Sequence, residues 1–378
     1  MKNLILFCLL AVCLACSTDG TCAAAENTIP FEMLGHLITV KASINDSPGE
    51  YTFIVDTGGL TFVDLDVAKA LELKQKGMMA KINTLDLSGF RIENVFCITA
   101  FDFSHFRRLG MPIHGIIGSN LLERYTATID FEAGGITLSS DTTAMAPPGN
   151  ALLMTFRNHP INNAPLVKLT VGSKEIEGMI DTGQPYPIVL PLASFEEYRE
   201  AEVIDFIRSN GLMEEWPNTT ADFNYLARLR SMAVGGLKLE HVVCLFGELP
   251  AMLSMPLIGS DLLSQFRLVI DYPRDELMLI PYDDVQPMDN SFSIGLRFDV
   301  SEENEVFVKG VWDGSPAAEA GIEIGDVIVS LDSKPVTRDN LIGLIDMMRD
   351  DDTESITLEV RRGEAAREVT LEKAMLFK

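Results

Sequence analysis

Two aspartates stand out because each follows an apolar stretch that would otherwise continue as a strand. The segment Tyr51–Asp64, YTFIVDTGGLTFVD, carries Asp56-Thr57-Gly58, and the segment Glu177–Pro191, EGMIDTGQPYPIVLP, carries Asp181-Thr182-Gly183. Aspartate is unfavourable inside strands and is rarely buried without partners. Two carboxylates held together divide one proton and can act as acid and base. We therefore expect these two aspartates to form a catalytic pair.

The sequence repeats itself around the two aspartates. Three further pairs of segments correspond, namely Leu37–Ile44 with Leu166–Val171, Gly89–Cys97 with Gly236–Cys244, and Ile117–Leu122 with Ile258–Leu263. Tandem copies predict two β-rich lobes related by an approximate two-fold axis, with one aspartate at the same position of each. The alternative, that both acids are ordinary turn residues, leaves the repetition unexplained.

The elements that would position the aspartates follow from local patterns. We expect strands over Leu37–Ile44 and Gly89–Ala100, a mobile hairpin over Gly77–Leu87, and short helices over Asp66–Leu73 and Asn120–Arg124. Ser119 is placed to cap the second of these helices. The extra length of the second copy, between residues 194 and 233, is expected to be a helical, polar insertion.

Length and composition limit the classes of protein that fit. The chain has 378 residues, 47% of them hydrophobic and 22% charged, which is typical of two or three ordered domains. Its formal net charge is −25. Nucleic-acid partners are excluded because phosphate binding needs a basic face.

The first 25 residues are identified as a targeting leader. Lys2 supplies the positive start, and Leu4–Leu14 is an apolar core too short to span a membrane as a mature helix. The sequence Leu14-Ala15-Cys16-Ser17 resembles a bacterial lipobox, which implies a lipid attached to Cys16, although Cys13 stands where that pattern prefers Leu. The alternative is cleavage after Ala23-Ala24-Ala25, which releases a soluble protein. Both interpretations predict export to the cell envelope, and the lipoprotein is preferred.

Cys97 and Cys244 are the two cysteines outside the leader region. An oxidising envelope permits a disulfide, but two buried thiols are the preferred expectation. Outside the leader region the sequence has no CxxC motif, and it has no HExxH motif and no His/Cys cluster, so we expect neither a metal nor another cofactor.

On these motifs the two halves resemble the retropepsin-like, pepsin-type aspartic proteases. The likeness covers about Glu32–Pro281 and includes the downstream Ile116-Ile117-Gly118 and Leu257-Ile258-Gly259 elements. It implies a mainly β, bilobal double barrel with pseudo-two-fold symmetry, the lobes spanning 30–148 and 149–283. It also implies that Asp56 and Asp181 hold a water and attack a peptide bond with it. By the same resemblance Thr57 and Thr182 bond across the lobes, while Gly58 and Gly183 let backbone N–H groups approach the carboxylates.

The residue that follows each D-T-G departs from that family. It is usually small there; Gly59 respects the size limit, but Gln184 does not. A large amide beside Asp181 can change the pKa of the pair, disturb the water or point away. The alternative function is therefore a catalytically inactive peptide-binding lipoprotein with a decayed second lobe.

Residues 288–375 resemble a PDZ domain of the bacterial protease-associated kind. The likeness is carried by S-I-G-L at 293–296, G-S-P-A at 314–317, A-G-I at 320–322 and G-D-V-I at 325–328. It implies a small α+β domain in which the N–H groups of Ile294, Gly295 and Leu296 hold a peptide carboxylate. The peptide would lie between Leu296–Val300 and a helix over Asp339–Arg349. The alternative is a domain that only packs on the lobes.

Together these features predict an aspartic endopeptidase of the cell envelope. Its partners would be polypeptide substrates, C-terminal peptides at the PDZ domain and a membrane through the lipid. A further alternative is an enzyme that stays latent until a partner engages the PDZ domain. Serine-protease chemistry has no support, because neither G-N-S-G-G nor G-x-S-x-G occurs.

Overall fold

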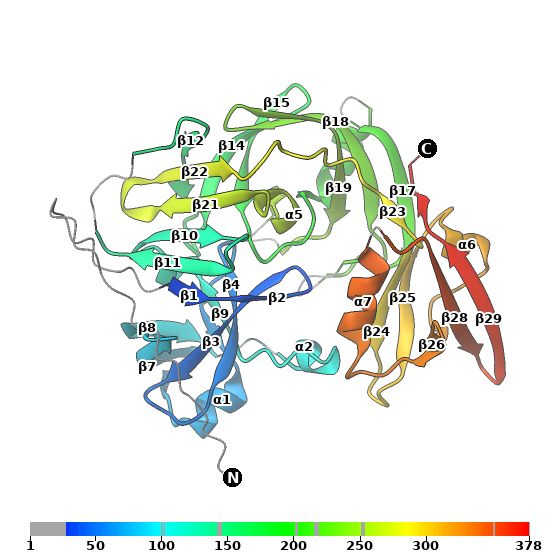
Figure 1. The fold of residues 1–378 in the computed structure, drawn as a ribbon, viewed down its shortest axis with the longest axis horizontal. Helices are drawn as coiled ribbons and strands as arrows, with labels where there is room; N and C mark the ends of the chain where they lie inside the picture. The colour runs from blue at the N-terminus through cyan, green and yellow to red at the C-terminus, as the bar shows by residue number, and fades with distance from the viewer. Residues whose placement is uncertain are drawn as a thin grey trace, which may run out of the picture.

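The computed structural model describes residues 28–377, apart from 100, 102, 142–145, 201–202, 215–218, 251–253 and 351. The expected leader and its Cys16 lie outside the described residues. Figure 1 shows two β-barrels, called lobe 1 and lobe 2, and a C-terminal domain beside them. The predicted mainly β double-barrel fold is confirmed.

Lobe 1 is a sheet that closes on itself. Its strands run in the order β2-β3-β4-β9-β5-β8-β7-β6, and pairing of β3 with β7 closes the barrel. The strands are β2 (Glu32–Leu34), β3 (Leu37–Ile44), β4 (Tyr51–Asp56), β5 (Phe62–Val63), β6 (Lys74–Lys76), β7 (Met79–Leu87), β8 (Phe90–Ile98) and β9 (Gly115–Gly118). Three short helices accompany them, α1 (Leu65–Ala70), α2 (Ser104–Arg108) and α3 (Ser119–Leu122).

Lobe 2 repeats this order strand for strand. Its path is β13-β14-β15-β20-β16-β19-β18-β17, and pairing of β14 with β18 closes it. The strands are β13 (Arg157–Asn158), β14 (Pro165–Val171), β15 (Lys174–Ile180), β16 (Ile188–Pro191), β17 (Val203–Gly211), β18 (Tyr225–Val234), β19 (Leu237–Gly247) and β20 (Leu257–Ile258). The helices are η1 (Leu192–Ser194), α4 (Phe195–Arg199) and α5 (Ser260–Leu263).

A six-stranded antiparallel sheet joins the lobes. Its order is β1-β11-β10-β21-β22-β12, so β10 of lobe 1 meets β21 of lobe 2 at the centre. The strands are β1 (Thr28–Pro30), β10 (Thr126–Asp130), β11 (Gly135–Ser139), β12 (Leu152–Thr155), β21 (Phe266–Asp271) and β22 (Glu276–Pro281), with η3 (Tyr272–Arg274) between the last two. The central register pairs Ala127 with Ile270 and Thr128 with Val269. The approximate two-fold axis therefore passes between β10 and β21.

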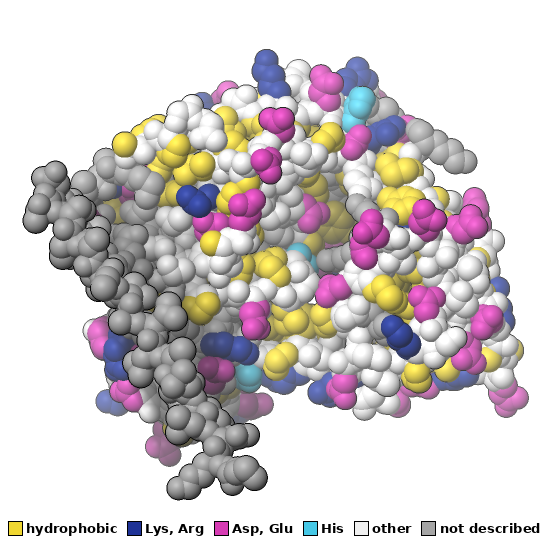
Figure 2. Space-filling model, viewed as in Figure 1, with side chains coloured by type: hydrophobic (Ala, Val, Ile, Leu, Met, Phe, Trp, Pro, Cys, Tyr) yellow, Lys and Arg dark blue, Asp and Glu magenta, His cyan; other side chains and the backbone are white. Residues whose placement is uncertain are grey.

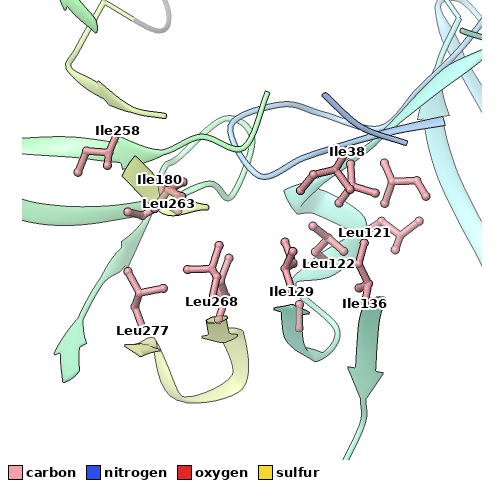
Figure 3. Close-up of a cluster of buried hydrophobic side chains, with 14 of the residues drawn as sticks. Ile38, Leu121, Leu122, Ile129, Ile136, Ile180, Ile258, Leu263, Leu268 and Leu277 are labelled. Carbon is pink, nitrogen blue, oxygen red and sulfur yellow. The ribbon is translucent and has the colours of Figure 1, made fainter. Parts of the chain in front are cut away.

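The apolar core continues from both barrels onto this sheet. Figure 3 shows Leu121 and Leu122 of α3 near Ile129 and Ile136, and Leu263 of α5 near Leu268. These side chains are almost completely buried. Burial of such a side chain contributes about 1.5–3 kcal/mol, so the paired helices anchor the segments beside each aspartate loop.

The C-terminal domain is a twisted sheet with two helices. Its strands are β23 (Phe292–Ser293), β24 (Leu296–Val300), β25 (Val306–Trp312), β26 (Val327–Leu331), β27 (Lys334–Pro335), β28 (Ser355–Arg362), β29 (Ala365–Glu372) and β30 (Ala374–Met375), and its helices are α6 (Pro316–Glu319) and α7 (Leu341–Arg349). Strand β25 also pairs with β17, which makes the domain sheet continuous with lobe 2.

Three local expectations were wrong. The insertion between 194 and 233 is mainly strand, because β17 and β18 pair with each other and β18 with β19, although α4 is helical. Ser119 does not cap α3. It is the first helical residue, and its hydroxyl donates to the Thr57 main-chain oxygen instead. The segment expected as a hairpin over Gly77–Leu87 is one strand, β7, with a turn at each end.

Candidate active site

Asp56 and Asp181 meet where the two lobes face each other. Asp56 ends β4 and Asp181 follows β15, the equivalent strand of lobe 2. Each carboxyl lies against the glycine of the opposite loop, and each changes the pKa of the other. Each carboxyl also accepts the N–H of the glycine two residues on, Gly58 to Asp56 Oδ1 at 2.8 Å and Gly183 to Asp181 Oδ1 at 2.9 Å.

The glycines of the two loops make room for the opposite carboxyl. A Cβ on Gly58 would lie 2.6 Å from Asp181 Oδ2, and a Cβ on Gly183 would lie 2.7 Å from Asp56 Cγ. Neither glycine has a positive φ angle. They are therefore required for close approach rather than for backbone conformation.

Thr57 and Thr182 form a reciprocal lock between the lobes. The N–H of each threonine donates to the hydroxyl of the other at 3.1 Å. The Thr57 hydroxyl donates to Ile180 O at 2.8 Å, and the Thr182 hydroxyl to Val55 O at 2.9 Å. Both side chains are fully buried, so every donor and acceptor of the lock is satisfied within the protein.

Side chains that were not predicted as part of the site buttress the loops. The Ser119 hydroxyl donates to Thr57 O at 2.6 Å and lies 2.7 Å from the Tyr272 hydroxyl of η3. Asn162 of lobe 2 donates to Gly58 O across the interface at 2.6 Å. The counterpart serine, Ser260, donates to Gln184 O at 3.0 Å. The repeated Ile-Gly-Ser at 117–119 and 258–260 was the available signal for the two serines.

The surroundings of the pair favour retention of a proton. Burial raises the pKa of both carboxyls, and the charge of Asp56 raises that of Asp181 further. N–H groups of Gly58 and Gly59 act in the opposite direction on Asp56. Both residues keep partial solvent exposure. The pair therefore holds one proton over a range in which free aspartates are ionised, and that proton belongs to the two residues together.

The Gln184 side chain is buried beside the pair and makes no hydrogen bond to either carboxyl, although its main-chain N–H donates to Asp181 O at 3.3 Å. Its side chain is 3% exposed, and its Oε1 has no hydrogen-bond partner among the described residues. Its main-chain oxygen accepts the N–H of Ser260 at 2.7 Å. In lobe 1 Gly59 occupies the equivalent position, where a Cβ would lie 2.5 Å from Asp56 Oδ2. The two lobes thus differ immediately after the aspartate loops.

The expected carboxylate loop of the C-terminal domain precedes β24. The Gly295 N–H donates to Ser293 Oγ at 2.9 Å. The carbonyls of Ile294 and Gly295 accept N–H groups of Ala317 and Trp312, both at 3.0 Å. Of the three predicted N–H donors, that of Gly295 is thus engaged within the domain itself. The helix expected over Asp339–Arg349 is present as α7.

Cys97 and Cys244 belong to strands β8 and β19 of the barrels and not to the aspartate loops. Cys97 and Cys244 are buried free thiols in different lobes, as preferred from the sequence. Burial raises the pKa of the Cys97 thiol to about 11, so it stays protonated. Within the described ranges, no three His, Cys, Asp or Glu side chains group together as metal ligands would.

Comparison with known proteins identifies one part of the chain. Residues 307–362 match the PDZ domain family. The match runs from β25 to β28 and includes α7, whereas the expected carboxylate loop and β24 precede it. The predicted C-terminal PDZ domain is thereby confirmed. No curated protein matches the chain. The double barrel is compatible with a pepsin-like arrangement.

Proposed function

We propose that the protein is an aspartic endopeptidase, with Asp56 and Asp181 as its catalytic pair. The observation that carries the proposal is the pairing of the two carboxyls at the lobe interface, each fixed by a glycine N–H. A structural aspartate in a turn bonds its own loop and has no need of a second acid across an interface. The glycines required for close approach and the threonine lock add support.

The chemistry follows from one shared proton. The ionised carboxylate takes a proton from a water while the protonated carboxyl donates to the substrate carbonyl. The water oxygen attacks the carbonyl carbon and gives a tetrahedral diol with no covalent enzyme intermediate. A proton passed to the leaving nitrogen then allows the C–N bond to break.

The test is cleavage of an unfolded protein by the purified chain at mildly acid pH. Activity should disappear in both Asp56→Asn and Asp181→Asn while each variant stays folded. A wild-type protein that binds peptides but cleaves none at any pH would instead support the inactive peptide-binding function. The observation that favours this second candidate is Gln184, whose buried amide oxygen has no hydrogen-bond partner among the residues that the structure describes.

We also propose that the PDZ domain recruits or gates protein substrates, and that the protein works in the cell envelope. PDZ domains bind peptides, which suits a polypeptide partner. The export proposal rests on the leader sequence, with Cys16 as the proposed lipid site. None of the helices in the described part of the chain could cross a membrane. Acidic side chains are spread over the face drawn in Figure 2, in keeping with a protein that does not bind nucleic acid.

A further inference from the structure

The PDZ domain is held on lobe 2 by a shared sheet. Strands β17 and β25 pair antiparallel, with Ser209 opposite Trp312 and Gly211 opposite Gly310. Trp312 is 4% exposed and belongs to an apolar cluster that includes Met213 of lobe 2. Main-chain pairing combined with a buried aromatic side chain makes this a fixed attachment.

The contact with lobe 1 is of a different kind. Residues 103–111, here called the α2 segment, lie between β8 and β9 and contain α2. Figure 1 shows α2 reaching from the lobe 1 barrel toward α7 and β24 of the PDZ domain. One apolar cluster includes side chains of both parts, with Phe103, Phe106, Leu109 and Met111 from the segment and Leu296, Phe298, Ile342 and Ile345 from the two PDZ elements.

The α2 segment lies near both walls of the groove in which a PDZ peptide would lie. At the α7 wall, a Cβ on Gly110 would come 2.5 Å from Arg338 O and 3.9 Å from Asp339 Cα, just before the helix begins. At the β24 wall, Leu296 and Phe298 belong to the same apolar cluster as Phe106 of the segment. Strand β24 pairs only with β25 among the described strands, so its other edge borders the groove.

We infer that the α2 segment is a displaceable internal occupant of the PDZ groove. A peptide with a free C-terminal carboxylate and an apolar last residue binds by pushing the segment out. The segment suits this role because a five-residue helix has little stability of its own and depends on what it packs against. The Arg107–Asp64 ion pair, at 2.6 Å, holds the segment to its own lobe, so its release does not require the barrel to unfold.

Displacement of the α2 segment would affect the aspartate pair through the strand that follows the segment. The α2 segment leads into β9, which pairs in parallel with β4 and places Gly118 opposite Asp56. Gly118 also lies against the backbone of Gly59 and Leu60. This part of the inference rests on the proposed function, because it makes a peptide at the PDZ domain a regulator of cleavage. Occupancy of the groove does not depend on cleavage.

The first test compares two glycine substitutions that share a backbone conformation. Gly110 has φ +79° and no room for a Cβ, while Gly35 of lobe 1 has φ +62° and no atom within 4 Å of one. The probe is a fluorescent peptide ending in valine with a free carboxylate, and its C-terminal amide serves as the ligand control. Gly110→Ala should bind the free-acid peptide about tenfold more tightly than wild type, because the competing segment is pushed off. Gly35→Ala should match wild type.

The second test needs no substitution in the segment. Hydrogen exchange of residues 103–111 is measured with and without the free-acid peptide, and faster exchange in its presence is expected because the segment leaves its packed position. Equal affinity of Gly110→Ala and wild type, unchanged exchange on peptide binding, or no binding by either protein would overturn the inference. If Gly110→Ala fails to fold, the exchange experiment decides. Both tests can be run on Asp181→Asn, so a failure of the proposed protease activity is seen separately.

Discussion

The two lobes share one strand order yet differ at the outermost strand. In lobe 1 this strand is β6, three residues long, and its turn into β7 carries the exposed Met78. In lobe 2 the equivalent β17 has nine residues and continues into the PDZ sheet. Near the axis the lobes match closely. Symmetry therefore constrains the fold near the axis, whereas the outermost strand of each lobe is free to pair with another domain.

In the symmetric part of the fold, the aspartate loop of one lobe contacts the equivalent loop of the other lobe. Thr57 bonds Thr182, Gly58 borders Asp181 and Gly183 borders Asp56. A change in one copy removes a partner from the other, so both copies are held to the same chemistry. Residues that bond no group of the other lobe have no such constraint, and directly after the two loops Gly59 differs from Gln184.

The largest expected effect tests whether the two aspartates are equivalent. Asp56→Asn and Asp181→Asn should each lower kcat/KM for an unfolded protein substrate by about a thousandfold or more, since each removes the acid–base pair. Residual activity is measured with freshly purified variants whose melting is checked in parallel. One variant keeping near wild-type activity would show that the lobes are not catalytically symmetric. Glu93→Gln, in an exposed part of lobe 1, is the matched control.

A second prediction concerns the threonine lock and protein stability. Thr57→Val or Thr182→Val should lower the free energy of unfolding by about 2–4 kcal/mol, because each leaves the partner N–H and a buried carbonyl unsatisfied. The double variant should lose less than the two single losses added together, since both act on one network. Denaturant unfolding of the three proteins gives these values. Single losses below about 1 kcal/mol would contradict a lock in which each hydroxyl satisfies two buried groups.

A third prediction uses the raised pKa of the pair. The folded protein holds a proton that the unfolded carboxyls release above their ordinary pKa of 3.8, so this contribution to stability is complete below that value and is lost as pH rises toward the folded pKa. Wild type should lose up to about 1.4 kcal/mol more per pH unit than Asp181→Asn over that range. Urea unfolding at several pH values between 4 and 7 measures the difference. Parallel pH profiles of the two proteins would show that no proton is shared.

Much of the fold could be predicted because it is written twice in the sequence. Strand β3 has the predicted bounds, and Asp130 and Asp271, which end β10 and β21, each lie 12 residues after the glycine of the repeated Ile-Gly-Ser (118 to 130 and 259 to 271). The insertion was misassigned because its charged start does form a helix, α4, whereas β17 and β18 are defined by pairing with each other, with β19 and with the more distant β25 and β14. Such pairing leaves little local pattern.

Contacts of the candidate site that cross between the lobes were harder to predict from the sequence than the aspartates themselves. Ser119 has the residue type of an N-cap, but a carbonyl of the Thr57 loop and the Tyr272 hydroxyl compete for its side chain. The packing of residues 103–111 on the PDZ domain joins parts of the chain nearly two hundred residues apart in sequence. The run of phenylalanines at 101, 103 and 106 was the only local sign of it.

The smallest expected effect concerns Gln184, where the lobes differ beside the pair. Gln184→Ala removes buried packing and also an amide oxygen that has no partner, so the two contributions offset and stability should change by less than about 1 kcal/mol. Because no hydrogen bond joins the Gln184 side chain to either carboxyl, the pH profile of cleavage should stay in place. Gly59→Ala is the informative contrast, since its Cβ would press on Asp56 and should lower kcat by at least about tenfold. A shifted profile in Gln184→Ala would mean that the amide tunes the pair after all, and that the asymmetry of the lobes extends into the chemistry.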